Sequence, residues 1–219
     1  MGRRFPGREQ NRRYRAELRG GESGVMVIRM KRPQTWKRFC GALLAGGISI
    51  IIVLRWFEHN QVYHPSRNWY ATGDELGRPF EKVFFESSDG VKLSGWFFAV
   101  SGNSPDSHPT ALVCHGNAGN ISHRLDLCRV LLDEGLNVFL FDYRGYGLSE
   151  GRPSEDGTYR DAKAAFQWLN RKGLHQIIAY GESLGGGVAS QLCLEQKTAG
   201  LILQSTFTSI PDIGADLFP

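Results

Sequence analysis

Residues 177–187 read Ile-Ile-Ala-Tyr-Gly-Glu-Ser-Leu-Gly-Gly-Gly, and this stretch decides the fold. The apolar residues at its start predict a short buried strand, and the small residues at its end predict the first turn of a helix. A sharp turn between the two requires glycine on both sides of Ser183, because a side chain at Gly181 or Gly185 would clash. Gly186 and Gly187 are expected, with Gly185, to let the helix approach the sheet closely.

Such a turn lifts the Ser183 hydroxyl above the edge of the sheet, at the N-terminus of the following helix. The partial positive charge of a helix N-terminus favours a developing anion. We therefore predict that Ser183 is a catalytic nucleophile. A phosphate-binding loop is the main alternative for a glycine-rich turn, but no Gly-Lys-Ser/Thr follows here.

A second loop, residues 115–119 (His-Gly-Asn-Ala-Gly), leaves an earlier predicted strand at the same edge of the sheet. Acyl transfer requires two preorganised backbone N–H donors for the oxyanion of the tetrahedral intermediate. The N–H of Leu184 is one expected donor, and the N–H of Asn117 is the best candidate for the other. Taken alone, the loop could equally be a plain turn.

The rest of the chain alternates between strands and helices. Two strands joined by a glycine-containing turn predict an antiparallel hairpin, and short apolar strands separated by helices predict a mainly parallel sheet covered on both faces. The predicted strands are residues 82–86, 92–100, 111–114, 138–141, 177–180 and 201–203.

Three segments together resemble the α/β-hydrolase superfamily: residues 115–124 (HGNAGNISHR), 141–149 (FDYRGYGLS, with Gly151) and 180–187 (YGESLGGG). The branch they most resemble is the bud-emergence-type group of single-pass membrane serine hydrolases. The resemblance implies a hydrolase of esters, thioesters or amides that acts on a small-molecule or acyl substrate without a cofactor. It also places residues 205–210 beside the substrate pocket, so that the expected substrate contacts are His115, Gly116, Thr206 and Phe207.

The rest of the catalytic triad is not evident. In this fold an acid and then a histidine follow the serine, whereas all six histidines here precede it. His115 and His123 lie at the correct edge, but neither is expected to replace the missing base, and Asp212 and Asp216 come too early for the usual acid. We therefore expect the chain to be a fragment with an incomplete sheet, of about six strands where the fold normally has eight. Ser183 is expected to be catalytically inactive in this fragment by itself. A non-catalytic scaffold with hydrolase architecture is the alternative.

The N-terminal region carries most of the positive charge. Residues 1–38 contain twelve Lys or Arg and three Glu, a charge of +9, and the remainder carries −5. Sixteen uncharged residues follow at 39–54, spanning about 24 Å at ~1.5 Å per residue, and Trp36 and Trp56 lie at their ends. This pattern predicts a membrane anchor with a cytoplasmic N-terminus. A cleaved signal peptide and a buried helix are the alternatives, and nucleic-acid binding by the tail is not expected.

The predicted organisation is a basic cytoplasmic tail (1–38), an anchor (39–57), a linker (58–81) and a partial hydrolase domain (82–219) on the opposite side of the membrane. Met26 and Met30 are alternative start sites. The four cysteines show no metal-ligand spacing and no disulfide framework, so buried free thiols are expected and no metal site is predicted.

Overall fold

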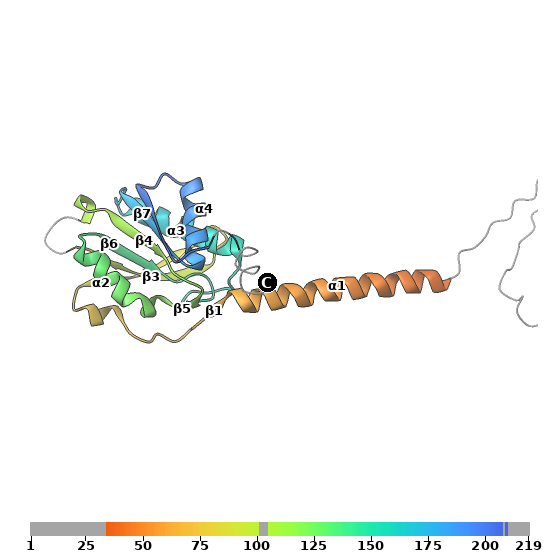
Figure 1. The fold of residues 1–219 in the computed structure, drawn as a ribbon. Helices are drawn as coiled ribbons and strands as arrows, with labels where there is room; N and C mark the ends of the chain where they lie inside the picture. Colours follow the sequence, from red (N-terminus) through yellow and green to blue (C-terminus); the bar gives the residue numbers. More distant parts are fainter. Residues whose placement is uncertain (1–33, 101–104, 208, 210–219) are drawn as a thin grey trace, which may run out of the picture. The chain divides into compact units, whose positions relative to one another are not determined.

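The computed structural model describes residues 34–100, 105–207 and 209, which divide after Trp56 into two units (Figure 1). Most of the basic tail therefore lies outside the described residues, as do Asp212 and Asp216. The first element is helix α1, Gln34–Val62. Its segment Trp36–Leu54 is apolar and none of it is buried, and it is the single candidate membrane span within the described part of the chain. Its 19 residues span about 28 Å at ~1.5 Å per residue, close to the thickness of a bilayer core.

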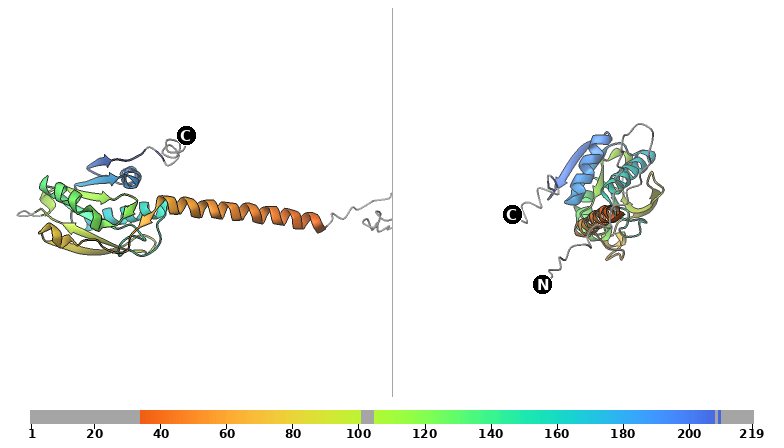
Figure 2. Two further views of the ribbon diagram at one scale, coloured as in Figure 1. Left: turned by 60° about the horizontal axis from the view of Figure 1, so that its bottom comes forward. Right: turned by 90° about the vertical axis from the view of Figure 1, so that its right-hand side faces the viewer.

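A six-stranded sheet with the order β2-β3-β6-β4-β7-β8 forms the centre of the second unit. The hairpin strands β2 and β3 are antiparallel, β3 is also antiparallel to β6, and the remaining pairs are parallel. The hairpin and β8 form opposite edges of this sheet (Figure 2). The strands are β2 Phe80–Glu86, β3 Lys92–Phe98, β4 Thr110–Cys114, β6 Asn137–Phe141, β7 Ile177–Glu182 and β8 Gly200–Gln204.

All six predicted strands are therefore present, and their ends differ by one or two residues. Strand β3 ends at Phe98, earlier than predicted, because the Val100 N–H donates to the Asn137 side chain and not to a strand. Strand β7 extends to Glu182, later than predicted, because Gly181 and Glu182 still pair with β8. A partner remote in the chain, which periodicity does not report, decides each end: the Asn137 side chain for β3 and strand β8 for β7.

Helices cover both faces of the sheet, as predicted (Figure 1). Alternate strand residues point to opposite faces. Leu112 and Phe139 pack with α3 (Glu155–Arg171) and α4 (Leu184–Glu195) on one face. Val113 and Leu140 pack with α2 (Leu125–Asp133) on the other.

Local sequence signals fix the ends of these helices. The Asn120 side chain accepts the Ser122 N–H and caps the 3-10 turn η3 (Ile121–Arg124), which leads into α2. Ser154 caps α3 by accepting the Gly157 N–H. A second short 3-10 turn, η2, covers Pro105–Ser107 ahead of β4.

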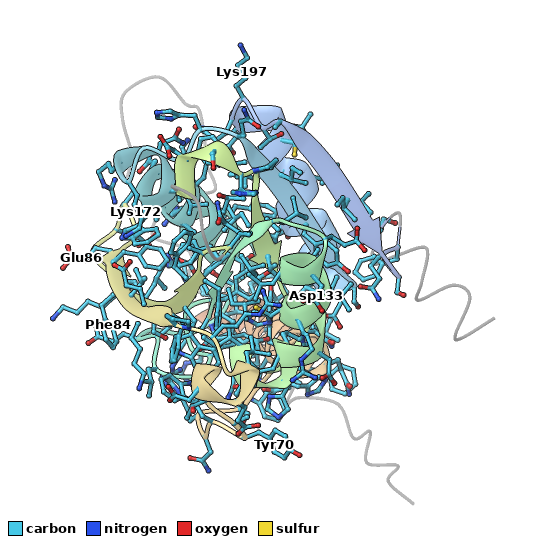
Figure 3. All side chains as sticks on the ribbon, turned by 90° about the vertical axis from the view of Figure 1, so that its left-hand side faces the viewer. Tyr70, Phe84, Glu86, Asp133, Lys172 and Lys197 are labelled. Carbon is cyan, nitrogen blue, oxygen red and sulfur yellow. The ribbon has the colours of Figure 1, made fainter. Side chains whose placement is uncertain are left out.

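The hairpin is fastened to α3 by Arg144, which belongs to the glycine-rich loop after β6. Its guanidinium contacts Asp161 of α3 at 2.8 Å and Asp89 of the hairpin turn at 2.7 Å. Arg144 and Asp161 are both buried, so their charges are removed from water and satisfied by each other. The Arg144 hydrogen bond and charge hold the pKa of Asp89 well below its usual value. On the outer side of the hairpin, Phe84 points into solvent (Figure 3).

The segment expected to be a linker, residues 58–81, is more than a connection. It contains the last turn of α1, the short strand β1 (His64–Pro65), the 3-10 turn η1 (Gly73–Leu76) and the start of β2. Strand β1 pairs with β5, Ala118–Gly119. Trp69 packs edge-on against Trp96 at 5.0 Å between ring centroids. These contacts make most of this segment part of the domain, because its aromatic residues complete the core on the α2 face.

Candidate functional site

Ser183 lies between β7 and α4 in a strained backbone conformation, with φ 52° and ψ −117°. Residues other than glycine rarely adopt this region, and such strain is typical of functional turns. A Cβ at Gly181 would lie 2.5 Å from the carbonyl oxygen of Gly185, and a Cβ at Gly185 would lie 1.9 Å from the carbonyl oxygen of Cys114. The two flanking glycines therefore meet the steric requirement expected from the sequence.

Gly186 and Gly187, the next two glycines, differ in the space that surrounds them. A Cβ at Gly186 would lie 2.0 Å from Thr206 Oγ1, so this position must remain small. Gly187 has nothing within 4 Å, and the expectation that it allows close approach to the sheet is wrong, because this side of the helix faces solvent. Thr206 donates from Oγ1 to the Ser183 carbonyl oxygen at 2.9 Å. Its hydroxyl thus supports the turn itself, which differs from the substrate contact expected of it.

Two backbone N–H groups beside the turn have no acceptor among residues 34–100, 105–207 and 209. Neither the N–H of Leu184 nor that of Asn117 donates a hydrogen bond to any residue in the described part of the chain. The Asn117 carbonyl oxygen, in contrast, accepts the His64 N–H at 3.0 Å and the Tyr146 hydroxyl at 2.8 Å. The Asn117 side chain donates to the Val62 carbonyl at 3.1 Å. Asn117 is therefore held at its carbonyl and its side chain while its N–H stays unpaired.

His115 packs against the loop at residues 115–119 from the interior of the domain. Its side chain is fully buried and lies against Tyr143 and Tyr146. Its Nδ1 lies 2.8 Å from the Gly116 carbonyl oxygen, which can only accept, so Nδ1 carries the proton. The Gly116 carbonyl and the Asn117 N–H belong to one planar peptide unit, so this bond orients the N–H. The sequence-based expectation of a substrate contact at His115 does not fit this burial.

Asp142, at the end of β6, is buried beside His115. Its Oδ1 accepts the Ile121 N–H at 2.9 Å and lies 3.9 Å from His115 Nε2. Burial raises the pKa of Asp142 to about 7 and lowers the pKa of His115 to about 3, because both charged forms lose hydration. The imidazole is therefore neutral, and among the described residues neither its Nε2 nor Asp142 Oδ2 has a hydrogen-bond partner.

The shifted pKa values of His115 and Asp142 predict how the free energy of unfolding depends on pH when Asp142 is replaced. The lowered pKa of His115 makes the native state lose stability as the pH falls from 6.5 towards 3, and the raised pKa of Asp142 makes it lose stability as the pH rises from 3.8 towards 7. The two effects oppose each other in the wild-type protein. In Asp142→Asn only the His115 effect remains, so we expect the free energy of unfolding to rise with pH more steeply than in wild type between pH 4 and pH 6, by up to about 1.4 kcal/mol per pH unit.

Urea unfolding followed by tryptophan fluorescence at several pH values measures this difference. Parallel pH curves for the two proteins would contradict the assignment of a buried neutral pair. The variant Asp126→Asn, at an exposed carboxylate on α2, is the control and should follow wild type.

The described histidines are occupied elsewhere. His64 contacts the Gln61 carbonyl, His108 the Gly135 carbonyl and His175 the Asn170 side chain. His123 accepts the Asn120 N–H, and Tyr70, which points outwards in Figure 3, stacks on its ring. Within the described residues, no imidazole is hydrogen-bonded to Ser183 Oγ.

The sequence interpretation missed several supporting residues. Asp142, Tyr143 and Tyr146 follow β6 directly, and the Tyr143 hydroxyl donates to the His115 carbonyl oxygen at 3.1 Å. Their position after a predicted strand at the same sheet edge was the available signal. Arg124 and Glu182, an ion pair with 2.8 Å between Nε and Oε2, were also unassigned. No cluster of metal-binding side chains occurs among residues 34–100, 105–207 and 209, and Cys114 and Cys128 are buried free thiols whose pKa burial raises to about 12.

Known proteins resemble this chain in sequence and fold. The model of the serine aminopeptidase (S33) family matches residues 105–217. Protein bem46 of Schizosaccharomyces pombe is 39% identical over 160 residues, covering 70% of this chain and 53% of that protein. An uncharacterized membrane protein of Saccharomyces cerevisiae is 33% identical over 193 residues, covering 84% and 66%. Among solved structures, a Pyrococcus furiosus esterase superposes with a TM-score of 0.59 at 29% identity, covering 70% of this chain and 60% of the esterase.

The chain spans between 53% and 66% of the length of the relatives it matches first. The family model extends over strands β4, β6, β7 and β8, the serine turn and the loop that faces it. The comparisons agree with the α/β-hydrolase fold predicted from the sequence. On these grounds the protein is a member of the bem46-like α/β hydrolases, within the serine aminopeptidase (S33) family.

Proposed function

We propose that this protein is a membrane-anchored serine hydrolase that cleaves an ester, thioester or amide, with Ser183 as nucleophile. One observation carries the proposal: the strained serine turn lies beside two backbone N–H groups, those of Asn117 and Leu184, that donate to none of the residues the structure describes. Leu184 is the first residue of α4, where backbone N–H groups have no partner within the helix, and both Leu184 and Asn117 are half-buried, so both N–H groups are free to donate to a bound group. An oxyanion is the ligand that fits next to a serine hydroxyl.

In the proposed reaction the Ser183 oxygen attacks the substrate carbonyl carbon, and the carbonyl π electrons move onto its oxygen. The two N–H groups then donate to this oxyanion. This costs little reorganisation, because His115 already holds the peptide that carries the Asn117 N–H and Tyr146 holds the Asn117 carbonyl that follows it. As the intermediate collapses, the bond to the leaving group breaks, and the alcohol, thiol or amine departs with the proton that the Ser183 hydroxyl gave up. Water then hydrolyses the acyl-serine to a carboxylic acid and restores the Ser183 hydroxyl. Phe207, half-buried just after Thr206, is proposed to contact the substrate.

Activation of Ser183 needs a general base, and none of the described histidines is bonded to it. We therefore propose that residues 1–219 by themselves turn over slowly, since losing the base of a serine triad costs roughly 10⁴–10⁶-fold in turnover. The same observation favours the second candidate, a membrane-anchored scaffold in which the serine turn has only a structural role.

A fluorophosphonate probe distinguishes the two candidates. It should label the full-length protein at Ser183, as found by mass spectrometry of the labelled peptide. Residues 1–219 alone should be labelled far more slowly. Full-length protein that resists the probe, or that is labelled at another residue, would favour the scaffold.

Membrane anchoring is proposed from α1, whose exposed apolar segment has a length suited to a bilayer, and from the name of the Saccharomyces cerevisiae relative. The basic tail places the N-terminus in the cytoplasm and the hydrolase domain on the opposite side. Protease treatment of sealed membrane vesicles tests the orientation, with epitope tags at the two ends of the chain. Digestion of both tags would overturn the proposed orientation. Extraction of the protein at alkaline pH would overturn the membrane anchor.

A further inference from the structure

Arg124 and Glu182 connect the two halves of the proposed site. Glu182 is the residue directly before Ser183, and Arg124 is the last residue of η3, shortly after the loop. Arg124 Nε donates to Glu182 Oε2 at 2.8 Å, and its Nη2 donates to the Ala118 carbonyl oxygen at 3.1 Å. The same Glu182 oxygen accepts the Gly116 N–H at 3.4 Å. The pair therefore holds the loop on both sides of Asn117.

Both side chains are partly shielded from water, with 14% of Arg124 and 30% of Glu182 exposed. Charge-assisted hydrogen bonds are stronger than neutral ones, and partial burial strengthens them further. A Cβ at Gly116 would lie 3.3 Å from Arg124 Nη2 and 3.6 Å from Glu182 Cδ, so the loop packs directly on the pair.

We propose that Arg124 and Glu182 are positioning residues, which fix the Asn117 N–H relative to the Leu184 N–H so that both reach one oxyanion. This inference rests on the proposed function of the same site. Because Glu182 accepts the Gly116 N–H, that group is turned away from the substrate and Asn117 supplies the loop's donor. Leu184 follows Ser183 directly. The Arg124–Glu182 pair, called the clamp below, therefore acts on the N–H groups of both Asn117 and Leu184 through very short stretches of backbone.

Charge gives the pair a second effect. A lone carboxylate at Glu182 would repel the oxyanion that develops next to Ser183, and the guanidinium of Arg124 offsets this repulsion. Removal of Arg124 should therefore do more harm than removal of the Glu182 charge. Replacing both residues with glutamine should recover part of the loss, because the unpaired carboxylate is then absent.

The test compares Arg124→Gln, Glu182→Gln and the double variant in full-length protein purified in detergent, with a short-chain p-nitrophenyl ester as substrate. We expect Arg124→Gln to lower kcat by about 10- to 100-fold with KM within about 2-fold, since the loss of a complete oxyanion donor costs ~10²–10³-fold. Glu182→Gln should lose less, and the double variant should be more active than Arg124→Gln. Arg129→Gln is the matched control, because Arg129 lies in α2 close in sequence to Arg124, but its side chain is 54% exposed and makes only a long contact, 3.9 Å, with Asp126.

The outcomes separate this inference from the proposed function. If Ser183→Ala abolishes hydrolysis while Arg124→Gln matches Arg129→Gln, the serine hydrolase stands and the clamp is overturned. If Ser183→Ala leaves hydrolysis unchanged, the proposed function fails. A purely structural role for the pair predicts parallel losses of melting temperature, kcat and substrate affinity, with no recovery in the double variant, and that result would also overturn the clamp.

Discussion

Ser183→Ala is expected to reduce ester hydrolysis by the full-length protein about 10⁴- to 10⁶-fold in kcat, the cost typical for loss of a serine nucleophile. The hydroxyl makes no hydrogen bond to any described residue, so its removal should leave the fold intact. Turnover of a p-nitrophenyl ester measures the first effect, and the urea midpoint, expected to stay within about 0.5 kcal/mol of wild type, measures the second.

Ser190→Ala is the matched control for this variant. Ser190 is half-buried in α4, about two helical turns beyond the strained turn. We expect it to keep wild-type turnover. Residual hydrolysis by Ser183→Ala near the wild-type rate would exclude Ser183 as nucleophile, whereas equal losses in both variants would point to a general effect on α4.

Gly185→Ala is expected to have the largest effect on stability. The added Cβ would lie 1.9 Å from the Cys114 carbonyl oxygen and 2.7 Å from that of His115, and both obstacles are backbone atoms that cannot rotate away. Helix α4 must then move away from β4, which we expect to lower the free energy of unfolding by about 3 kcal/mol or more. The same shift would displace the Leu184 N–H and reduce turnover.

Gly187→Ala tests the same substitution two residues further along the helix. Its Cβ meets nothing within 4 Å, so the change should stabilise the protein by roughly 0.5–1 kcal/mol, because alanine loses less conformational freedom than glycine in a helix. Urea unfolding followed by tryptophan fluorescence compares both variants with wild type. Equal stabilities of Gly185→Ala and Gly187→Ala would contradict the close approach of α4 to the sheet at Gly185.

The sequence predicted most of the sheet because apolar runs such as 138–141 and 177–180 report burial directly. It did not predict how far β3 and β7 extend, since those ends depend on partners remote in the chain, the Asn137 side chain for β3 and strand β8 for β7. It also predicted a linker where Trp69 and β1 are part of the domain, because mixed polarity with scattered proline and glycine resembles a connection whether or not its aromatic residues are packed.

The same division holds at the proposed site. Composition and spacing alone indicated the serine turn, the loop opposite it and an apolar helix ahead of the domain, because each depends on neighbouring residues. Only the tertiary structure decided that His115 is buried and orients a peptide, that Thr206 supports the turn, and that Arg124 reaches Glu182. Hydrogen bonds between side chains and distant backbone groups leave no periodic pattern in a sequence, so the parts of the chain that hold the site in place became visible only once the strands were brought together.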